Sequence, residues 1–192
     1  ALNADLLLVE KVQAGDMAAF DQLLRKHRER VYSLLYNLTG NREEAYDLCQ
    51  ETFIRAFRCI HRFKQNASFQ TWVCRIGVNT ALTYLKRERR RRFFSLDEID
   101  TELAPEEVIS HLSIDPDVDQ AIFLQELKEK LNQALQVLSS KHRAVVVMSE
   151  IEGMDHAAIA EVMQCSEGTV RSRLHYAKQQ LKQFLKNYLP KK

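Results

Sequence analysis

The side chains in this sequence that are best suited to recognise a partner are arginines and lysines close to polar residues. Arg171 and Arg173 follow a Gln164-Cys165-Ser166 turn, and one guanidinium group can donate to O6 and N7 of a guanine together. The polar and cationic neighbours on the same predicted helix are Thr169, Ser172, His175, Tyr176 and Lys178. This pattern predicts recognition of bases in a DNA groove. The alternative is an amphipathic helix whose basic face is only solvated.

A second cationic cluster lies in the N-terminal half, where six of the seven residues 86–92 are Lys or Arg. The candidate contact residues in and before it are Phe63, Lys64, Phe69, Trp72, Asn79, Thr80, Lys86, Arg87 and Arg90. Aromatic rings stack on unpaired bases and cations bind the backbone, so the set predicts binding of single-stranded nucleic acid. Trp72 also has the spacing of a core residue. Asn79 and the loop from Phe63 to Phe69 need not be buried.

Motifs for catalysis are missing from the sequence. It contains no glycine-rich phosphate loop, no H-E-x-x-H and no G-x-S-x-G. Cys59 and His61 are too few ligands for a closed metal site. We therefore expect no enzyme, no catalytic residue, no metal, no cofactor and no small-molecule substrate.

Composition favours a helical protein in the cytoplasm. Only five Gly and three Pro occur in 192 residues, which is few for the turns of an all-β fold, whereas a 45% hydrophobic fraction suffices for packed cores. The longest apolar runs, residues 6–9 and 144–148, are far shorter than the ~20 residues of a membrane span, and no signal peptide is evident at residues 1–5. The four cysteines are isolated in apolar segments, which predicts reduced and buried thiols; the alternative is disulfides or metal ligands.

The net charge of +2 conceals a strong segregation of charge along the chain. Residues 1–92 carry +7, residues 93–119 carry −9 without any Lys or Arg, and residues 120–192 carry +4. We therefore predict two helical domains, 1–92 and 120–192, joined by an acidic flexible linker, 93–119. The linker is either a solvated spacer or a negatively charged strand that occupies a cationic nucleic-acid channel on a partner.

Apolar periodicity and capping residues predict three helices in the first domain. Asp16 caps one that ends at Leu38, and Asn41 caps a second whose outer face bears Asp47, Gln50, Glu51 and Ile54. Ser68 caps a third helix, from Phe69 to about Arg91.

Four helices are predicted in the second domain. The first has an apolar stripe through Leu131, Leu135 and Leu138, and the second ends at Gly153. Asp155 caps a short third helix, and the fourth turns Val170, Leu174, Ala177, Leu181, Leu185 and Tyr188 inward. The last two helices have the dimensions of a helix-turn-helix.

Four strings in this order carry a resemblance to a known family. They are Gly15–Phe20, Asp47–Ala56, Phe69–Thr80 and Gly168–Leu174. The chain resembles the extracytoplasmic-function (group 4) sigma factors of bacterial RNA polymerase and is similar to their sigma-E and sigma-W branches, over residues 5–92 and 125–188. The resemblance implies an all-α protein with sigma region 2 and region 4 domains.

The resemblance also implies roles for the residues above. Asp47, Gln50, Glu51 and Ile54 would dock on the coiled coil of the largest subunit of core RNA polymerase. The set from Phe63 to Arg90 would melt and recognise the −10 promoter element. The helix-turn-helix set would recognise the −35 element beside the flap region, and the linker would thread toward the RNA exit path. Tyr46, Cys49 and the His61-Arg62 pair depart from the usual family pattern, and the His61-Arg62 change leaves the exact −10 preference open.

Family members also suggest control of an envelope stress regulon by an anti-sigma factor, often anchored in the membrane. Two other functions fit parts of the sequence. One is a helix-turn-helix regulator that binds DNA alone as a dimer, and the other is a helical adaptor that binds only protein. Neither requires an acidic docking face together with a −10-binding segment.

Overall fold

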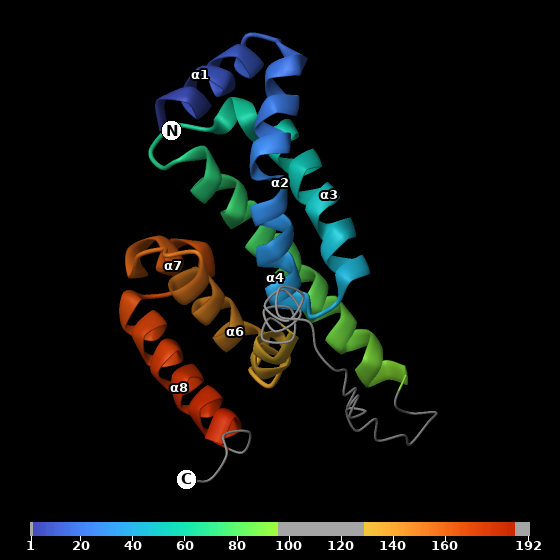
Figure 1. Cartoon of the computed structure of the whole chain (residues 1–192), viewed down its shortest axis with the longest axis vertical. Coiled ribbons are helices and arrows are strands. Elements are labelled where there is room, and N and C mark those ends of the chain that lie inside the picture. The colour runs from blue at the N-terminus through green and yellow to red at the C-terminus, as the bar shows by residue number, and fades with distance from the viewer. Residues whose placement is uncertain (1, 96–128, 187–192) are drawn as a thin grey trace, which may run out of the picture.

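The computed structural model describes residues 2–95 and 129–186, and all regular elements within these ranges are helical (Figure 1). They are α1 (Leu2–Gln13), α2 (Met17–Thr39), α3 (Arg42–Cys59), η1 (Ile60–Arg62), α4 (Phe69–Ser95), a helical stretch over residues 129–136, α6 (Ser140–Val146), a π-helical segment η2 (Val147–Ile151), α7 (His156–Met163) and α8 (Glu167–Lys186). This confirms the predicted all-α class. Most of the predicted acidic linker lies outside the described residues.

The predicted caps in the first domain are confirmed. The Asp16 carboxylate accepts from the Ala19 amide at 3.3 Å, the Asn41 side chain from the Glu44 amide at 3.2 Å, and the Ser68 hydroxyl from the Thr71 amide at 3.0 Å. Gly40 ends α2 with a φ of +76°, a left-handed conformation that a residue with a Cβ adopts at a cost. Local side-chain chemistry therefore sets the helix boundaries of this domain.

α1 is not among the predicted helices, because only a narrow side of it is buried. Val9 and Val12 pack into the core, and Asp5 anchors the helix to α2. The Asp5 carboxylate lies 2.6 Å from Lys26 Nζ and 3.0 Å from His27 Nε2. Burial lowers the pKa of His27, and the charge of Asp5 opposes that shift.

The core of the first domain forms where α2, α3 and α4 pack side by side. Fully buried residues on these helices include Leu23, Leu34, Leu35, Leu38, Ala45, Ala56, Phe69 and Val73. None of the described helices is both long and apolar enough to cross a bilayer.

The second domain packs α8 across α6 and α7, around Leu135, Val145, Met148, Ile159 and Val170. Two expectations for this domain are wrong. Leu185 is 43% exposed, because the far end of α8 extends past the core, and Leu131 is 46% exposed. The helix predicted to reach Gly153 changes to π-helical geometry over η2.

The cysteine expectation is corrected in part. All four thiols are free, and Cys49 and Cys74 are buried. Cys59 and Cys165 are only half-buried, because one lies at the end of a helix and the other in a turn.

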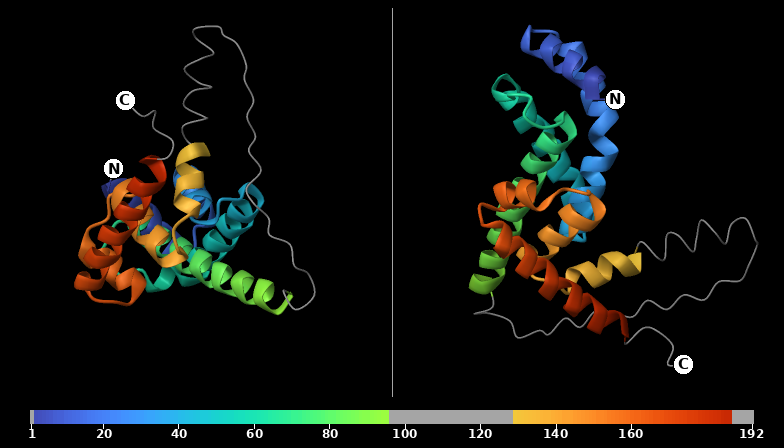
Figure 2. Two further views of the ribbon diagram at one scale, coloured as in Figure 1. Left: turned by 90° about the horizontal axis from the view of Figure 1, so that it is seen from below. Right: turned by 90° about the vertical axis from the view of Figure 1, so that its left-hand side faces the viewer.

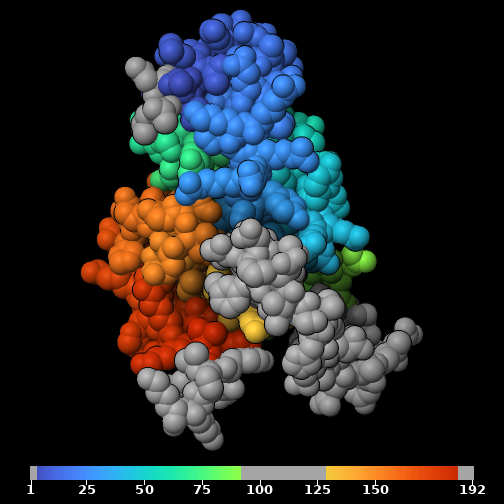
Figure 3. Space-filling model, in the orientation of Figure 1, coloured from blue at the N-terminus to red at the C-terminus, as the bar shows by residue number. Residues whose placement is uncertain are grey.

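The two domains are in direct contact. α6 and η2 lie against α2, and α6 and α7 lie against α4, so that the second domain covers one side of the first (Figures 1 and 2). In the space-filling view, residues of the two domains meet in one continuous surface (Figure 3).

Candidate functional site

The predicted helix-turn-helix is present in α7 and α8. Asp155 caps α7 by accepting from the Ala158 amide at 2.7 Å, and Gln164 ends it in the left-handed conformation with a φ of +49°. Ser166 then caps α8 by accepting from the Thr169 amide at 3.2 Å. Val170 and Ala177 are fully buried against the rest of the domain. The second helix is therefore held firmly, with its outer face free for contacts.

The seven side chains predicted to contact the −35 element differ in exposure. Arg171, Ser172, His175, Tyr176 and Lys178 are exposed on α8. Thr169 is half-buried, and its hydroxyl lies 3.0 Å from that of Ser166. Arg173 is also half-buried, and its guanidinium donates to Cys165 Sγ at 3.7 Å. Arg171 is consequently the better placed of the two guanidinium groups for a base.

Lys178 has a partner of opposite charge in the same domain. Its Nζ lies 3.0 Å from Glu150, and the hydrogen bonds from Lys178 and Ser149 lower the pKa of that carboxyl. A phosphate that binds Lys178 must compete with this carboxylate.

The loop before α4 is more tightly packed than its sequence suggests. Phe63 is 6% exposed and Phe69 is 1% exposed, so the expectation that this loop need not be buried is wrong for its two end rings. Both rings contact Trp72, with centroid separations of 5.1 and 5.7 Å, and Trp72 itself is half-buried. The three rings form the hydrophobic support of the loop, and stacking of Phe63 or Phe69 on a base would require the loop to rearrange.

The polar tip of that loop is accessible. Lys64 is exposed, and Gln65 has a left-handed φ of +59°. Gln13 of α1 fixes the start of the loop by donating to the Ile60 carbonyl at 2.8 Å. The loop therefore presents its backbone and Lys64 from a rigid base.

Farther along α4, the polar candidates separate into exposed and buried groups. Asn79 is exposed, whereas Thr80 is 2% exposed and its hydroxyl donates to the Ile76 carbonyl at 2.8 Å. Lys86, Arg87 and Arg90 are all exposed. Asn79 and the cationic end of α4 are thus available to a ligand, and Thr80 is occupied within its own helix.

The outer face of α3 bears the four residues predicted to dock on polymerase. Asp47, Gln50 and Glu51 are exposed, and Ile54 is 51% exposed. Glu51 pairs with Arg55, one turn along the helix, at 2.5 Å. Such an exposed pair contributes little to stability, so the face is available for a partner.

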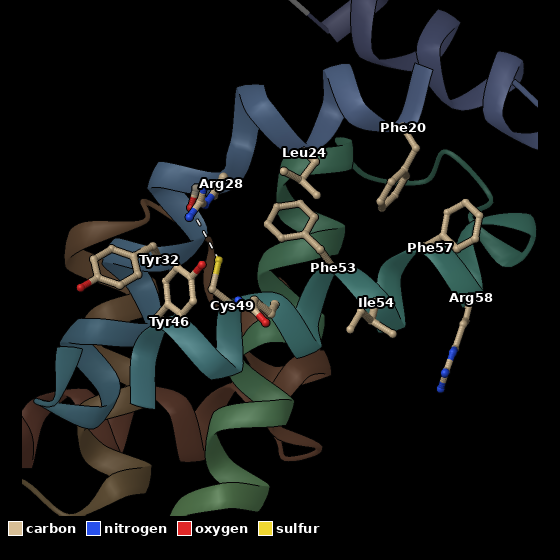
Figure 4. Close-up of a pocket in the computed structure, with 11 residues that line it drawn as sticks. Phe20, Leu24, Arg28, Tyr32, Tyr46, Cys49, Phe53, Ile54, Phe57 and Arg58 are labelled. Carbon is tan, nitrogen blue, oxygen red and sulfur yellow. Dashed lines mark hydrogen bonds between the residues drawn. The ribbon is translucent and has the colours of Figure 1, made fainter. Parts of the chain in front are cut away.

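An apolar groove runs beside this face, between α2 and α3 (Figure 4). Its volume is about 490 Å³, and its walls include Phe20, Leu24, Tyr46, Phe53, Ile54 and Phe57. Arg28 and Arg58 lie at its two ends, and Arg28 lies over the Tyr46 ring at 5.6 Å from the centroid. An apolar groove with charged ends fits the apolar face of an amphipathic helix.

The sequence did not single out this groove, because Phe20 and Leu24 carry the ordinary spacing of core residues. Tyr46 is the signal that was available, since it is a large aromatic residue on an otherwise polar helix face, and it is 45% exposed. Among the described residues, no cluster of His, Cys, Asp and Glu could hold a metal ion.

Comparison with known proteins identifies both domains. Residues 23–91 match the Sigma-70 region 2 family, and residues 128–181 match Sigma-70, region 4. The chain is 34% identical over 186 residues to the RNA polymerase sigma-H factor of Pseudomonas aeruginosa, with 96% of this chain and 95% of that protein covered. It is 40% identical over 174 residues to the ECF RNA polymerase sigma factor SigE of Mycolicibacterium smegmatis, covering 89% of this chain but 64% of that protein.

A solved structure shares the fold. The sigma factor RpoE of Bartonella quintana, in complex with the anti-sigma factor NepR, superposes with a TM-score of 0.63 at 24% identity, over 87% of this chain and 96% of that one. The sequence matches, supported by the shared fold, show that the chain belongs to the extracytoplasmic-function sigma-factor family.

Proposed function

We propose that this chain binds core RNA polymerase through the face of α3, and directs initiation by binding −10 DNA with the loop and outer face of α4 and −35 DNA with α8. The observation that carries the proposal is the coexistence on one chain of the exposed face Asp47, Gln50 and Glu51 with two separate basic surfaces. A regulator that binds duplex DNA alone needs only the basic helix-turn-helix.

Promoter opening then needs no hydrolysis. Groove contacts by α8 locate the duplex, and capture of an extruded base near Lys64 and Asn79 offsets the few kcal/mol of unstacking. Differential affinity for the open strand is sufficient to shift the equilibrium. An anti-sigma factor belongs in the proposal as an inhibitory partner, since the Bartonella protein of the same fold was crystallised with one. The stress regulon is likewise proposed by analogy with the family.

The test is run-off transcription with core polymerase on a genomic promoter library. We expect initiation at defined start sites with the wild type. Asp47→Lys combined with Glu51→Lys should abolish co-purification with core and leave helicity intact, because both side chains are exposed. Glu10→Lys combined with Asp21→Lys is the matched control, because it makes the same charge change at exposed sites on α1 and α2.

Two results would count against the proposal. One is the absence of initiation from every promoter, together with a dimeric mass in solution, which would favour the stand-alone regulator. The other is retained co-purification of the α3 charge-reversal variant with core.

A further inference from the structure

α1 supports both ends of the loop over residues 63–68, although none of its residues belongs to the predicted −10 set. α1 and η1 lie side by side, with the loop beginning where η1 ends (Figure 1). At the start of the loop, Gln13 of α1 donates to backbone carbonyls. Just after the loop, Phe69 lies against His27, whose imidazole is paired with Asp5 of α1.

The Gln13 amide joins the two ends of the single turn η1. Its Nε2 donates to the Ile60 carbonyl at 2.8 Å and lies 3.5 Å from the Phe63 carbonyl. The Ile60 carbonyl also accepts from the Phe63 amide at 3.1 Å, in the bond that closes η1. A carbonyl oxygen accepts two bonds and an amide nitrogen donates two, so Gln13 bonds both carbonyls without breaking that turn. Phe63 then leaves η1 with φ −72° and ψ 113°, and Gln13 thereby sets the direction in which the loop departs.

α1 is itself fixed, so the Gln13 amide is held in a defined place. Val9, in the middle of the helix, is fully buried. The Asp5 carboxylate lies 2.6 Å from Lys26 Nζ and 3.0 Å from His27 Nε2, both on α2. Apolar packing and these polar contacts together leave α1 little freedom to slide along α2.

His27 connects α1 to the far end of the loop. Its ring centroid lies 5.3 Å from that of Phe69, the first residue of α4. The Phe69 ring in turn contacts Phe63 at 6.3 Å and Trp72 at 5.7 Å. The aromatic rings therefore close the loop at its base, with Gln13 on one side and His27 on the other.

The tip of the loop has a conformation that needs such support. Gln65 has a φ of +59°, in the left-handed region that is unfavourable for a residue with a Cβ. A residue keeps such a conformation where the surrounding structure determines it. Lys64, Gln65 and Asn66 are all exposed, so packing of the tip does not supply the support. The fixed ends of the loop supply it instead.

We propose that Gln13 is a positioning residue for −10 recognition, because its bonds to the carbonyls of η1 hold the loop in the conformation that receives an extruded base. This proposal rests on the proposed −10 function. A preformed loop binds a base without the cost of ordering its own backbone. The apparent affinity falls with the fraction of molecules whose loop keeps this conformation, so loss of the Gln13 bonds should raise the Kd for the single strand.

Gln13→Met tests the proposal, because Met keeps the length of the side chain and removes both donors. Gln22→Met makes the same change at an exposed site on α2 and is the matched control. Gln13→Lys returns a donor to the site. Trp72 is the single tryptophan of the chain, and its ring lies 5.1 Å from that of Phe63. Quenching of its fluorescence by acrylamide therefore reports opening of the loop in the full-length protein, without DNA.

Two DNA probes separate positioning from a general loss of structure. The first is a single-stranded hexanucleotide from the −10 non-template strand of a promoter at which the wild type initiates. The second is the −35 duplex of the same promoter. Fluorescence polarisation of each labelled probe with the holoenzyme gives its Kd, and urea titration shows that the variants are folded. Gln13→Lys is measured by quenching alone, because its added charge would itself attract DNA.

We expect Gln13→Met to raise the Kd for the single strand about fivefold, which is the change expected for one ordinary hydrogen bond, and to leave the Kd for the −35 duplex within about twofold. Quenching of Trp72 should increase in Gln13→Met and return toward the wild-type value in Gln13→Lys. Gln22→Met should match the wild type throughout. Unchanged quenching in Gln13→Met, an unchanged Kd for the single strand, or an equal loss for both probes would each overturn the positioning role.

Run-off transcription separates failure of this proposal from failure of the function on which it rests. Initiation by the wild type, together with a Gln13→Met variant that matches it in quenching and binding, removes the positioning role and leaves the sigma function in place. A wild type that initiates from no promoter removes the −10 function, and with it the role of Gln13.

Discussion

Replacing Ile54 by Ala tests whether the groove between α2 and α3 is a binding surface. Ile54 is 51% exposed, so a partner helix in the groove can bury about half of its side chain. Removing three carbons costs about 0.8 kcal/mol each when they are fully buried, and about half of that here. The expected loss is therefore ~1 kcal/mol of binding free energy, or roughly a five- to tenfold increase in the Kd for core polymerase.

Leu7→Ala provides the matched control, because Leu7 is an aliphatic residue of similar exposure, 57%, on α1 and outside the groove. Unlabelled variants that compete with fluorescent wild-type protein for core polymerase give the Kd of each variant. Urea denaturation should show little difference between the two variants. Equal affinities for Ile54→Ala and Leu7→Ala would refute the assignment of the groove, whereas a large loss of stability in Ile54→Ala would show that Ile54 supports the core.

Three other predictions concern separate parts of the molecule. Arg171→Ala should weaken binding to a −35 duplex by about 1–3 kcal/mol and relax the sequence preference of the protein. Lys182→Ala, farther along α8, should weaken binding to all sequences alike. Electrophoretic mobility shifts on specific and scrambled duplexes distinguish these effects. Gly153→Ala should lower the free energy of unfolding by ~1–2 kcal/mol, because its φ of +66° is unfavourable for alanine although the added Cβ would touch nothing. Gly40→Ala should lower it by on the order of 1 kcal/mol more, because its added Cβ would also clash with Gln136. Equal losses in urea titrations of the two variants would contradict the close inter-domain contact. Burial lowers the pKa of His27 below its ordinary 6.5, so the contribution of His27 to stability is complete above pH 6.5 and is lost as the pH falls through the folded-state pKa. His27→Gln should therefore make the free energy of unfolding less dependent on pH in that window. An unchanged slope of stability against pH would contradict this prediction.

Local signals in the sequence were sufficient for most of the helices. Asp16, Asn41, Ser68 and Asp155 each cap the helix that was predicted to begin after them, because capping depends only on residues a few positions apart. The apolar stripe of α3 similarly predicted that Asp47 is exposed, as it is in the structure. Where the stripe was too narrow, as in α1, no helix was predicted.

The sequence identified the candidate site residues, but it was a poorer guide to which of their side chains are exposed. Arg171 and Asn79 lie on the surface as expected, whereas Phe63 and Phe69 are buried against Trp72. An aromatic residue next to a polar loop is compatible with either outcome. Only the packing of α1 and α4 against that loop decides between them.

The contacts between the domains illustrate why the remaining features could not be predicted. In the sequence, Arg30 is one of several cations on a polar helix face, and Glu152 is one acid before a glycine, so that each has the appearance of a solvated surface charge. Their pairing depends on the packing of η2 against α2, which no local rule supplies. Burial then changes the energetic weight of the pair, because the almost buried Glu152 carboxylate has lost water, and within the described residues the Arg30 guanidinium takes its place. A surface pair such as Arg42–Glu129, at 3.5 Å with both side chains largely exposed, follows the weaker rule, and its removal should not open the domains.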